Sequence, residues 1–280
     1  MLNPRIMKCA SVFLLFVFLV SFNVIAETAG GSDMENGSYM ENQIELGENL
    51  LNEVEKMFYS CRRGHYNSEK EPAEVIEALE YIKEKLDLLN NNDESLYYSG
   101  QIDFLLGEIY EVIGNQRKAA VHFNSSAKNA EKLIDIDSGN NTEGYRLLAD
   151  SYMRLMSYNG DMYMVSKAPE VIKLLNRALS IDNENYAALN SLAMYYVNAP
   201  QFGGGNVDRG IKDLERALES EDLFDNFISY IWLATAYHKK GNIAEAEDNI
   251  EKALQIYPDS SWAAYLLDQI KGGDSNQLRY

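Results

Sequence analysis

Apolar residues recur at helical spacing along most of the chain, and the clearest example runs from Tyr230 to Pro258. Two apolar stripes, one for each helix, are formed by Leu233, Ala234 and Tyr237 and by Ala246, Ile250 and Ala253. Gly241 separates the stripes, and Asn242 can cap the helix that follows. Pro258 ends the second helix because proline has no N–H to donate and crowds the preceding turn. The stretch therefore predicts a helical hairpin with small residues where its two helices approach.

The same order of a leucine, a small residue and a tyrosine occurs three more times upstream. The matching triplets are Leu106, Gly107 and Tyr110; Leu148, Ala149 and Tyr152; and Leu192, Ala193 and Tyr196. The marker tyrosines are about 40 residues apart, whereas a plain two-helix repeat has a period of ~34 residues. Long interhelix loops at 157–168 and 199–205 account for the excess, so the sequence predicts an irregular array.

This spacing resembles the tetratricopeptide repeat. Residues 230–258 match nearly completely, with Tyr230, Ala234 and Ile250 standing where the strict pattern has Trp, Gly and Phe. The resemblance is firm over 96–258 and weak over 43–89. It implies an all-α fold, an irregular TPR-like α-solenoid of helix–turn–helix hairpins with a C-terminal capping helix.

Segments on either side of the four repeats complete the predicted organisation. A degenerate hairpin precedes them, and Ser68 with Glu71 resembles a capping box at its second helix, which opens at Pro72. Asp259 can cap the last helix. The predicted boundaries are 1–26 signal peptide, 27–41 flexible tether, 42–94 degenerate hairpin, 95–258 four repeats, 259–271 capping helix and 272–280 tail.

The first 26 residues have the pattern of a secretory signal. Arg5 and Lys8 precede an uninterrupted apolar run over 12–20, and cleavage is expected after Ala26. An uncleaved N-terminal anchor is the alternative, although the apolar stretch is slightly short for the ~20 residues that a span needs. Either way the rest of the chain is exported, to the periplasm or outside the cell.

Composition limits the classes of partner. The 280 residues carry a formal net charge of −18, with a pI of about 4.6. Such a chain is repelled by nucleic-acid backbones and anionic lipid surfaces, so we expect no nucleic-acid binding and no membrane contact after signal cleavage. Cys61 is left alone once the segment with Cys9 is removed, which excludes an intramolecular disulfide.

Stacked hairpins of this kind curve into a superhelix whose concave wall is made by the first helix of each unit. Residues on these helices that the core does not use are the candidate partner-binding residues: Phe104, Glu108, Glu111, Arg146, Asp150, Met153, Arg154, Asn190, Met194, Val197, Asn198, Thr235 and His238. Their mixture of polar, Met and aromatic side chains suits an extended peptide, a partner helix or a small organic ligand. The alternative is that they are solvated helix faces.

Tetratricopeptide domains that clamp a chaperone's acidic C-terminus use a row of Lys and Asn on this wall. Asn190 and Asn198 are present here without the lysines, which argues against that role. Arg146 and Arg154 are the cationic candidates and can meet a carboxylate or another anion.

Residues 200–205 read Pro-Gln-Phe-Gly-Gly-Gly and resemble a loop in exported tetratricopeptide proteins of the TRAP-transporter T-component type. The resemblance implies an accessory role in a periplasmic solute-uptake system, contact with a solute-binding protein and possible retention of a small ligand. Such proteins are usually lipoproteins, and Cys9 is not placed for lipidation. A phosphate-binding loop is disfavoured because the Lys and Ser/Thr that should follow the glycines are missing.

Catalytic patterns are weak. His65, His122 and His238 are scattered, none pairs with Glu at metal-ligand spacing, and no nucleophile elbow is present. We therefore expect no catalysis, cofactor or metal, and predict an exported scaffold that binds a protein or peptide. The TRAP-type accessory protein is the alternative, and an all-helical hydrolase is a third hypothesis.

Overall fold

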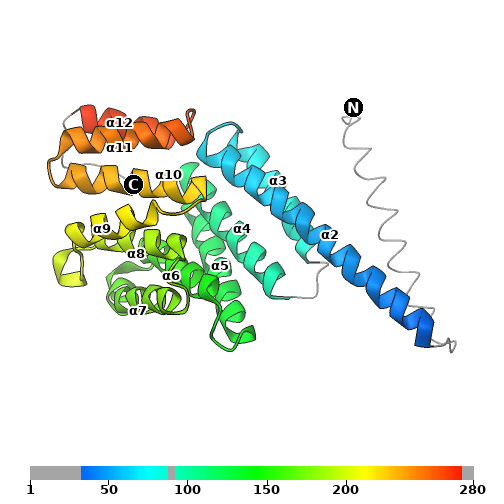
Figure 1. Ribbon diagram of the computed structural model, residues 1–280. Coiled ribbons are helices and arrows are strands. Elements are labelled where there is room, and N and C mark those ends of the chain that lie inside the picture. Colours follow the sequence, from blue (N-terminus) through cyan, green and yellow to red (C-terminus); the bar gives the residue numbers. More distant parts are fainter. Residues whose placement is uncertain (1–32, 88–91, 273–280) are drawn as a thin grey trace. The chain divides into compact units, whose positions relative to one another are not determined.

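The computed structural model describes residues 33–87 and 92–272, and their regular structure is helical throughout (Figure 1). The helices are α2 Asp33–Tyr66, α3 Pro72–Leu86, α4 Asp93–Val112, α5 Gln116–Ile136, α6 Thr142–Met156, α7 Gly160–Ile181, α8 Tyr186–Asn198, the 3₁₀ helix η2 Gln201–Gly203, α9 Val207–Ala217, α10 Leu223–Lys239, α11 Ile243–Ile256 and α12 Ser261–Lys271. The predicted signal peptide and residues 273–280 of the tail lie outside the described residues. The expected all-α solenoid is confirmed.

The chain divides into two compact units, with the boundary between Asn49 and Leu50. The hairpins and their contacts belong to the second unit. Helix α2 begins at Asp33, inside the segment for which the sequence predicts a flexible tether. Gly30 and Gly31 precede this start, whereas Gly37 is the only glycine or proline over residues 33–41, so few residues oppose helix formation there.

The four predicted repeats are four antiparallel hairpins, α4–α5, α6–α7, α8–α9 and α10–α11, each packed on the next. Their first helices also contact one another in order, α4 with α6, α6 with α8 and α8 with α10. This is the stacking that a tetratricopeptide array requires, because one hairpin cannot bury its apolar faces alone. Helix α12 packs on α11 and covers the end of the array, as predicted.

Small residues set how closely the helices approach. A Cβ at Gly107 would lie 2.5 Å from the Phe123 ring, and one at Gly100 would lie 2.6 Å from a Leu147 methyl group. Phe123 and Leu147 are completely buried. Each is worth ~1.5–3 kcal/mol once covered, so the glycines allow the packing from which the hairpins gain stability.

The long loop predicted over 157–168 is instead mostly helix. Helix α7 begins at Gly160 and continues past Pro169, so the insertion in the second repeat is extra helical turns. Between Gly160 and Pro169 no residue breaks the helical pattern. The second enlarged loop is irregular apart from η2, as expected.

Two predicted caps differ in the structure. The N-cap of α12 is Ser260, not Asp259, and its side chain accepts from the Ala263 N–H. The capping box at Ser68 does not form, because Glu71 is the N-cap of α3 and makes no side-chain bond there. Ser68 adopts the left-handed conformation, with φ of 54°, and its hydroxyl is used elsewhere.

No helix within residues 33–87 and 92–272 combines the length and apolarity that crossing a membrane requires.

Candidate binding surface

The thirteen predicted partner-binding residues lie on the first helices of the four hairpins, and most are covered. Those that are buried are Asp150, Asn190, Val197, Thr235 and His238; those that are half-buried are Phe104, Glu108, Glu111, Arg146, Met153, Arg154 and Met194. Asn198 is exposed. Partner binding at this wall remains a prediction. In this conformation its polar side chains are paired chiefly with other parts of the chain.

Arg154 of α6 joins two hairpins through two acidic partners on α4. Its guanidinium lies 2.8 Å from a carboxylate oxygen of Glu108 and 3.1 Å from one of Glu111. The hydroxyl of Tyr158 donates a short hydrogen bond to Glu111. Burial alone lowers the pKa of Arg154, but Glu108 and Glu111 outweigh it and raise this pKa. Arg154 is therefore already paired, rather than free to meet an anionic partner.

Tyr66, at the end of α2, completes this network. Its hydroxyl donates a 2.5 Å hydrogen bond to the Glu108 carboxylate, and burial together with Glu108 raises its pKa well above the ordinary value. Its ring lies 4.9 Å from that of Phe224 and 6.3 Å from that of Trp262, between centroids. One side chain thus contacts the first repeat, the start of α10 and helix α12.

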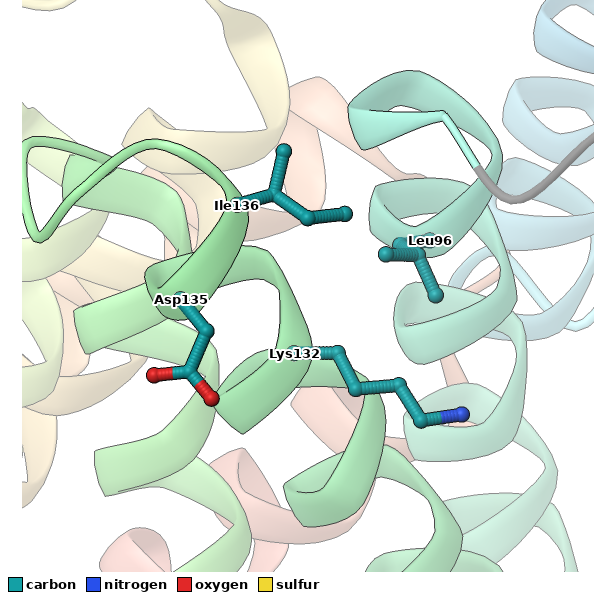
Figure 2. A pocket seen from close by; sticks show the side chains of 4 residues that line it. All are labelled: Leu96, Lys132, Asp135 and Ile136. Atoms are coloured by element: carbon teal, nitrogen blue, oxygen red, sulfur yellow. The ribbon is translucent and has the colours of Figure 1, made fainter.

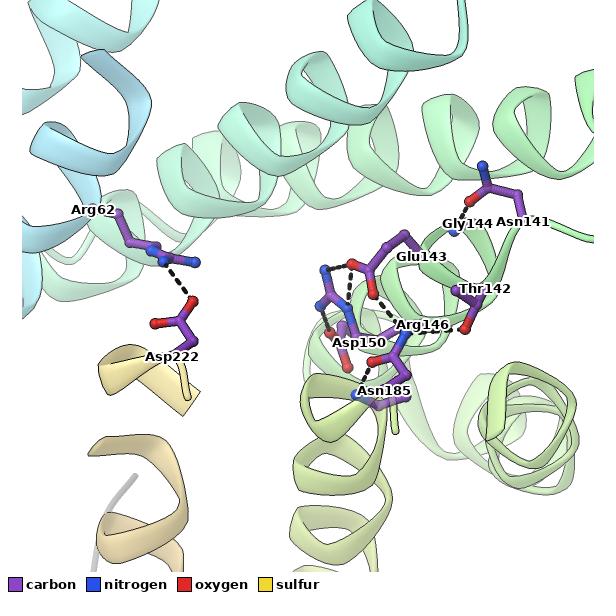
Figure 3. Close-up of polar contacts among 10 residues, drawn as sticks. Arg62, Asn141, Thr142, Glu143, Gly144, Arg146, Asp150, Asn185 and Asp222 are labelled. Atoms are coloured by element: carbon purple, nitrogen blue, oxygen red, sulfur yellow. Dashed lines mark hydrogen bonds and ion pairs between the residues drawn. The ribbon is translucent and has the colours of Figure 1, made fainter. Parts of the chain in front are cut away.

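The second cluster centres on Arg146 of α6 (Figure 3). The guanidinium lies 2.8 Å from Glu143 and 2.6 Å from Asp150, and the side-chain amide of Asn185 donates to Glu143 at 2.7 Å. Asn185 also caps α8 by accepting from the Ala188 N–H. The cluster therefore ties α6 to the start of α8 and leaves Arg146 without an open carboxylate-binding face.

The two acids of this cluster have opposite pKa shifts. Burial raises the pKa of Asp150, although Arg146 opposes the shift. Burial also works against ionisation of Glu143, but the Arg146 charge and the hydrogen bonds from Arg146 and Asn185 outweigh it and lower the pKa of Glu143. Glu143 is therefore the acid whose negative charge the cluster favours more strongly.

The last two repeats are joined through Asn190 of α8. Its amide nitrogen donates to the Asp225 carbonyl at 3.0 Å, and its amide oxygen accepts from Ser229 at 2.7 Å. Thr235 donates within α10 to the Ile231 carbonyl at 3.0 Å. Asn190 thus links α8 to α10, whereas the Thr235 bond stays within α10.

A closing contact, which the sequence does not predict, joins the turn after α2 to the segment before α12. The Asn67 side-chain oxygen accepts from the Asp259 N–H at 2.9 Å, and Ser68 Oγ accepts from the Ser261 N–H at 3.1 Å. The two serine hydroxyls are 2.8 Å apart. The left-handed conformation of Ser68 therefore places its hydroxyl on the N-terminus of α12.

Arg62 reinforces the closing contact from the last turns of α2. Its guanidinium carbon lies 4.1 Å from the centre of the Phe224 ring, and a guanidinium nitrogen lies 3.4 Å from the Asp222 carboxylate (Figure 3). Asp222 is the N-cap of α10. No periodicity relates Arg62 to Asp222, so a single sequence gives no signal for this pair.

A buried carboxylate joins the degenerate hairpin to the first repeat. Asp103 of α4 is completely buried and lies 2.6 Å from the Lys83 ammonium. It also lies 3.0 Å from His122 Nδ1 and accepts from Ser125 at 2.7 Å. Burial raises the pKa of this carboxyl, but the hydrogen bonds and the Lys83 charge outweigh burial and hold the pKa below the ordinary value.

Two shallow cavities lie away from the predicted residues. One has a volume of about 310 Å³ and lies between the start of α4 and the end of α5, with Leu96 and Ile136 facing each other across it (Figure 2). Lys132 and Asp135 complete its lining. The other, about 230 Å³, is lined partly by the buried Cys61. Among the described residues no group of His, Cys, Asp and Glu is placed to hold a metal ion.

Comparison with known proteins supports both resemblances found in the sequence. The family model described as the TRAP transporter T-component matches residues 145–272, which is fewer than half of the 280 residues. No curated protein matches the sequence.

Two solved structures align with most of this chain. MamA has a TM-score of 0.36 at 22% identity, covering 66% of this chain and 87% of that one. A thermophilic TPR protein from Thermus thermophilus superposes with a TM-score of 0.55 at 17% identity, covering 81% of this chain and 98% of that one. The superposition on the Thermus thermophilus protein shows that the fold is that of a tetratricopeptide-repeat protein.

Proposed function

From a tetratricopeptide fold whose residues 145–272 match the TRAP transporter T-component, we propose that this protein is an exported, non-catalytic accessory component of a TRAP-type solute-uptake system. Its partner in this proposal is the solute-binding protein of that system. The observation that carries the proposal is the family match, which spans the helices from α6 to α12.

The N-terminal sequence supports export. Arg5, Lys8 and the apolar run over 12–20 have the order of a secretory signal. The proposal places the mature protein outside the cytoplasmic membrane, beginning at Glu27. N-terminal sequencing of protein recovered from the extracytoplasmic fraction tests this, and a mature chain that retains Met1 in a cytoplasmic fraction would contradict it.

The ion pairs of the inner wall support a structural role for its charged residues. Arg146 and Arg154 are held in ion pairs with two acids each, and Glu143 is further fixed by Asn185. Such closed networks make a wall rigid, because each charged group already has its partner. A rigid scaffold that presents its surface to another protein is the role we assign.

The proposal is tested by binding between the full-length mature chain and the solute-binding protein of the same uptake system. We expect co-purification from the extracytoplasmic fraction and a saturable titration by calorimetry with both purified proteins. A solute-binding protein from an unrelated uptake system is the matched control and should not bind. Failure of the cognate pair to associate, with both proteins folded, would refute the accessory role.

A general scaffold for a protein or peptide is the second candidate, and the tetratricopeptide fold itself favours it. The two candidates differ in the partner recovered. Co-purification of another exported protein, together with no binding of the cognate solute-binding protein, would favour the general scaffold.

A further inference from the structure

Two insertions in the repeats carry exposed apolar side chains. The added turns at the start of α7 contain Met162, 85% exposed, and Val165, 69% exposed, and η2 contains Phe202, 94% exposed. Met164 is also exposed. Helix α7 and η2 contact each other, and a Cβ at Gly204, directly after η2, would lie 3.4 Å from Ile172 of α7, so both insertions adjoin α7. We name Met162, Met164, Val165 and Phe202 the insertion patch.

The loop that carries Phe202 is held firmly. Tyr195 donates from its hydroxyl to the Gly203 carbonyl at 2.6 Å, and the Asn206 N–H donates to the Tyr196 carbonyl at 2.9 Å. Gly204 has φ of +91°, and a Cβ at Gly205 would lie 1.8 Å from a carbonyl oxygen. The two glycines are therefore required by this conformation, and Phe202 is exposed on an ordered loop.

The start of α7 is anchored in a similar way. Tyr163 packs against the core, and its ring meets that of Tyr152 edge-on at 6.5 Å between centroids. Met162 and Val165, on either side of it in sequence, remain exposed. An apolar surface that is ordered before binding loses less conformational entropy when a partner covers it.

The charge around the patch limits which partner can cover it. Residues 160–166 and 200–206 contain a single charged residue, Asp161, in a chain that is 24% charged with a net charge of −18. The net negative charge of the whole chain disfavours a second copy of the chain and anionic lipid as the partner. It favours a protein whose matching surface is apolar with a neutral or basic rim, and Met and Phe are enriched in interfaces of this kind.

We propose that the insertion patch is the docking site for the solute-binding protein, a step that rests on the proposed function. Both insertions lie inside the segment 145–272 that matches the T-component family, and both add to the plain two-helix repeat. They therefore supply a surface that an ordinary tetratricopeptide array lacks. The internally paired wall of α4, α6, α8 and α10 is not required for this contact.

The experiment compares affinities of the purified full-length mature chain and its variants for the cognate solute-binding protein by calorimetry. The test variants are Phe202→Ser and the triple variant Met162→Ser/Val165→Ser/Phe202→Ser. Val121→Ser is the control, because Val121 is 61% exposed on α5 and lies outside the patch. All four side chains are exposed, so circular dichroism melting should be the same for every variant.

We expect Phe202→Ser to weaken binding about tenfold and the triple variant to weaken it further, as for a central interface residue, while Val121→Ser changes Kd less than about twofold. Unchanged affinity in the triple variant would overturn the docking site and leave the proposed function intact. Absence of binding by the wild type would contradict both the docking site and the proposed function. The docking site would also be contradicted if the patch variants changed dimerisation of this chain, or its binding to neutral phosphatidylcholine vesicles, without any effect on the complex with the solute-binding protein.

Discussion

Arg62 and Asp222 are 160 residues apart in sequence and form an ion pair, with a guanidinium nitrogen 3.4 Å from a carboxylate oxygen. Five residues after Arg62, the Asn67–Ser68 turn contacts the start of α12. The last turns of α2 thereby join the beginning of the described hairpins to their end. This closing contact explains why Tyr66 packs against the core of the first hairpins and against that of α10–α12.

Tyr66 combines a packing role and a polar role that two substitutions separate. Tyr66→Phe keeps the ring among Phe224 and Trp262 but loses the hydrogen bond to Glu108, and should lower the free energy of unfolding by about 1 kcal/mol. Tyr66→Ala also leaves a cavity and should cost about 2–4 kcal/mol. Urea unfolding measures both. The exposed Tyr265 supplies the control Tyr265→Phe, and equal losses in the two Tyr66 variants would contradict the assigned roles.

Removing Arg154 should destabilise the fold, because Glu108 and Glu111 would then face each other without a cation. We expect Arg154→Met to cost roughly 1–3 kcal/mol, less than a fully buried pair would, because the Arg154 side chain is 34% exposed. Lys252→Met breaks an exposed i,i+4 pair with Asp248 and should cost less than about 0.5 kcal/mol. Similar losses in the two variants, measured by urea unfolding, would show that the Arg154 network is unimportant.

Acid should remove the stability that Asp103 contributes. Its pKa in the folded chain lies below the ordinary value of 3.8, so its contribution is fully present above pH 3.8 and is lost as the pH falls through the lowered pKa. Asp103→Asn should therefore be less stable than wild type at pH 7. The difference in unfolding free energy should narrow on acidification below pH 3.8.

The exposed Asp248 provides the control for that titration. Asp248→Asn should change the unfolding free energy little at either pH, because its pair with Lys252 is exposed. If the difference in unfolding free energy between wild type and Asp103→Asn stays constant from pH 7 to below pH 3.8, folding does not favour the ionised form of Asp103.

Close approach of α4 and α5 depends on the absence of a side chain at Gly107. Gly107→Ala should cost about 1–3 kcal/mol by overpacking, since the new Cβ would lie 2.5 Å from the Phe123 ring. Gly47→Ala, also within a helix, meets nothing within 4 Å and should be neutral or stabilising by up to ~1 kcal/mol. Thermal melting of the two variants separates steric conflict from helix propensity, and a stabilised Gly107→Ala would contradict the packing.

The hairpins could be predicted because their determinants are local. Gly107, Tyr110 and Phe123 lie within two consecutive helices, and the spacing of small and large residues alone pairs those helices. Helix α7 departs from the prediction because the usual length of tetratricopeptide turns places residues 160–168 in a loop, whereas their own composition allows a helix.

The burial of the inner wall could not be predicted. The position of Asp150 and Thr235 on first helices follows from the repeat spacing, but their burial depends on what the neighbouring repeat and the rest of the chain place against them. The closing contact is harder still to predict from the sequence, because Asn67 and Asp259 are 192 residues apart and no pattern links them. Partner binding by the wall remains a prediction, whereas the exposed insertion patch is visible only in the structure.

The closing contact is tested most directly by a disulfide between Ser68→Cys and Ser261→Cys, whose hydroxyls lie 2.8 Å apart. In the mature chain that begins at Glu27 and carries Cys61→Ala, we expect mild oxidation to give a monomer with both engineered thiols lost and a higher melting temperature, because the new bond closes a long loop. Ser68→Cys with Val121→Cys, the latter at an exposed position of α5, serves as the control and should stay reduced. Free thiols at positions 68 and 261 after oxidation, or cross-linking only between molecules, would contradict the closing contact.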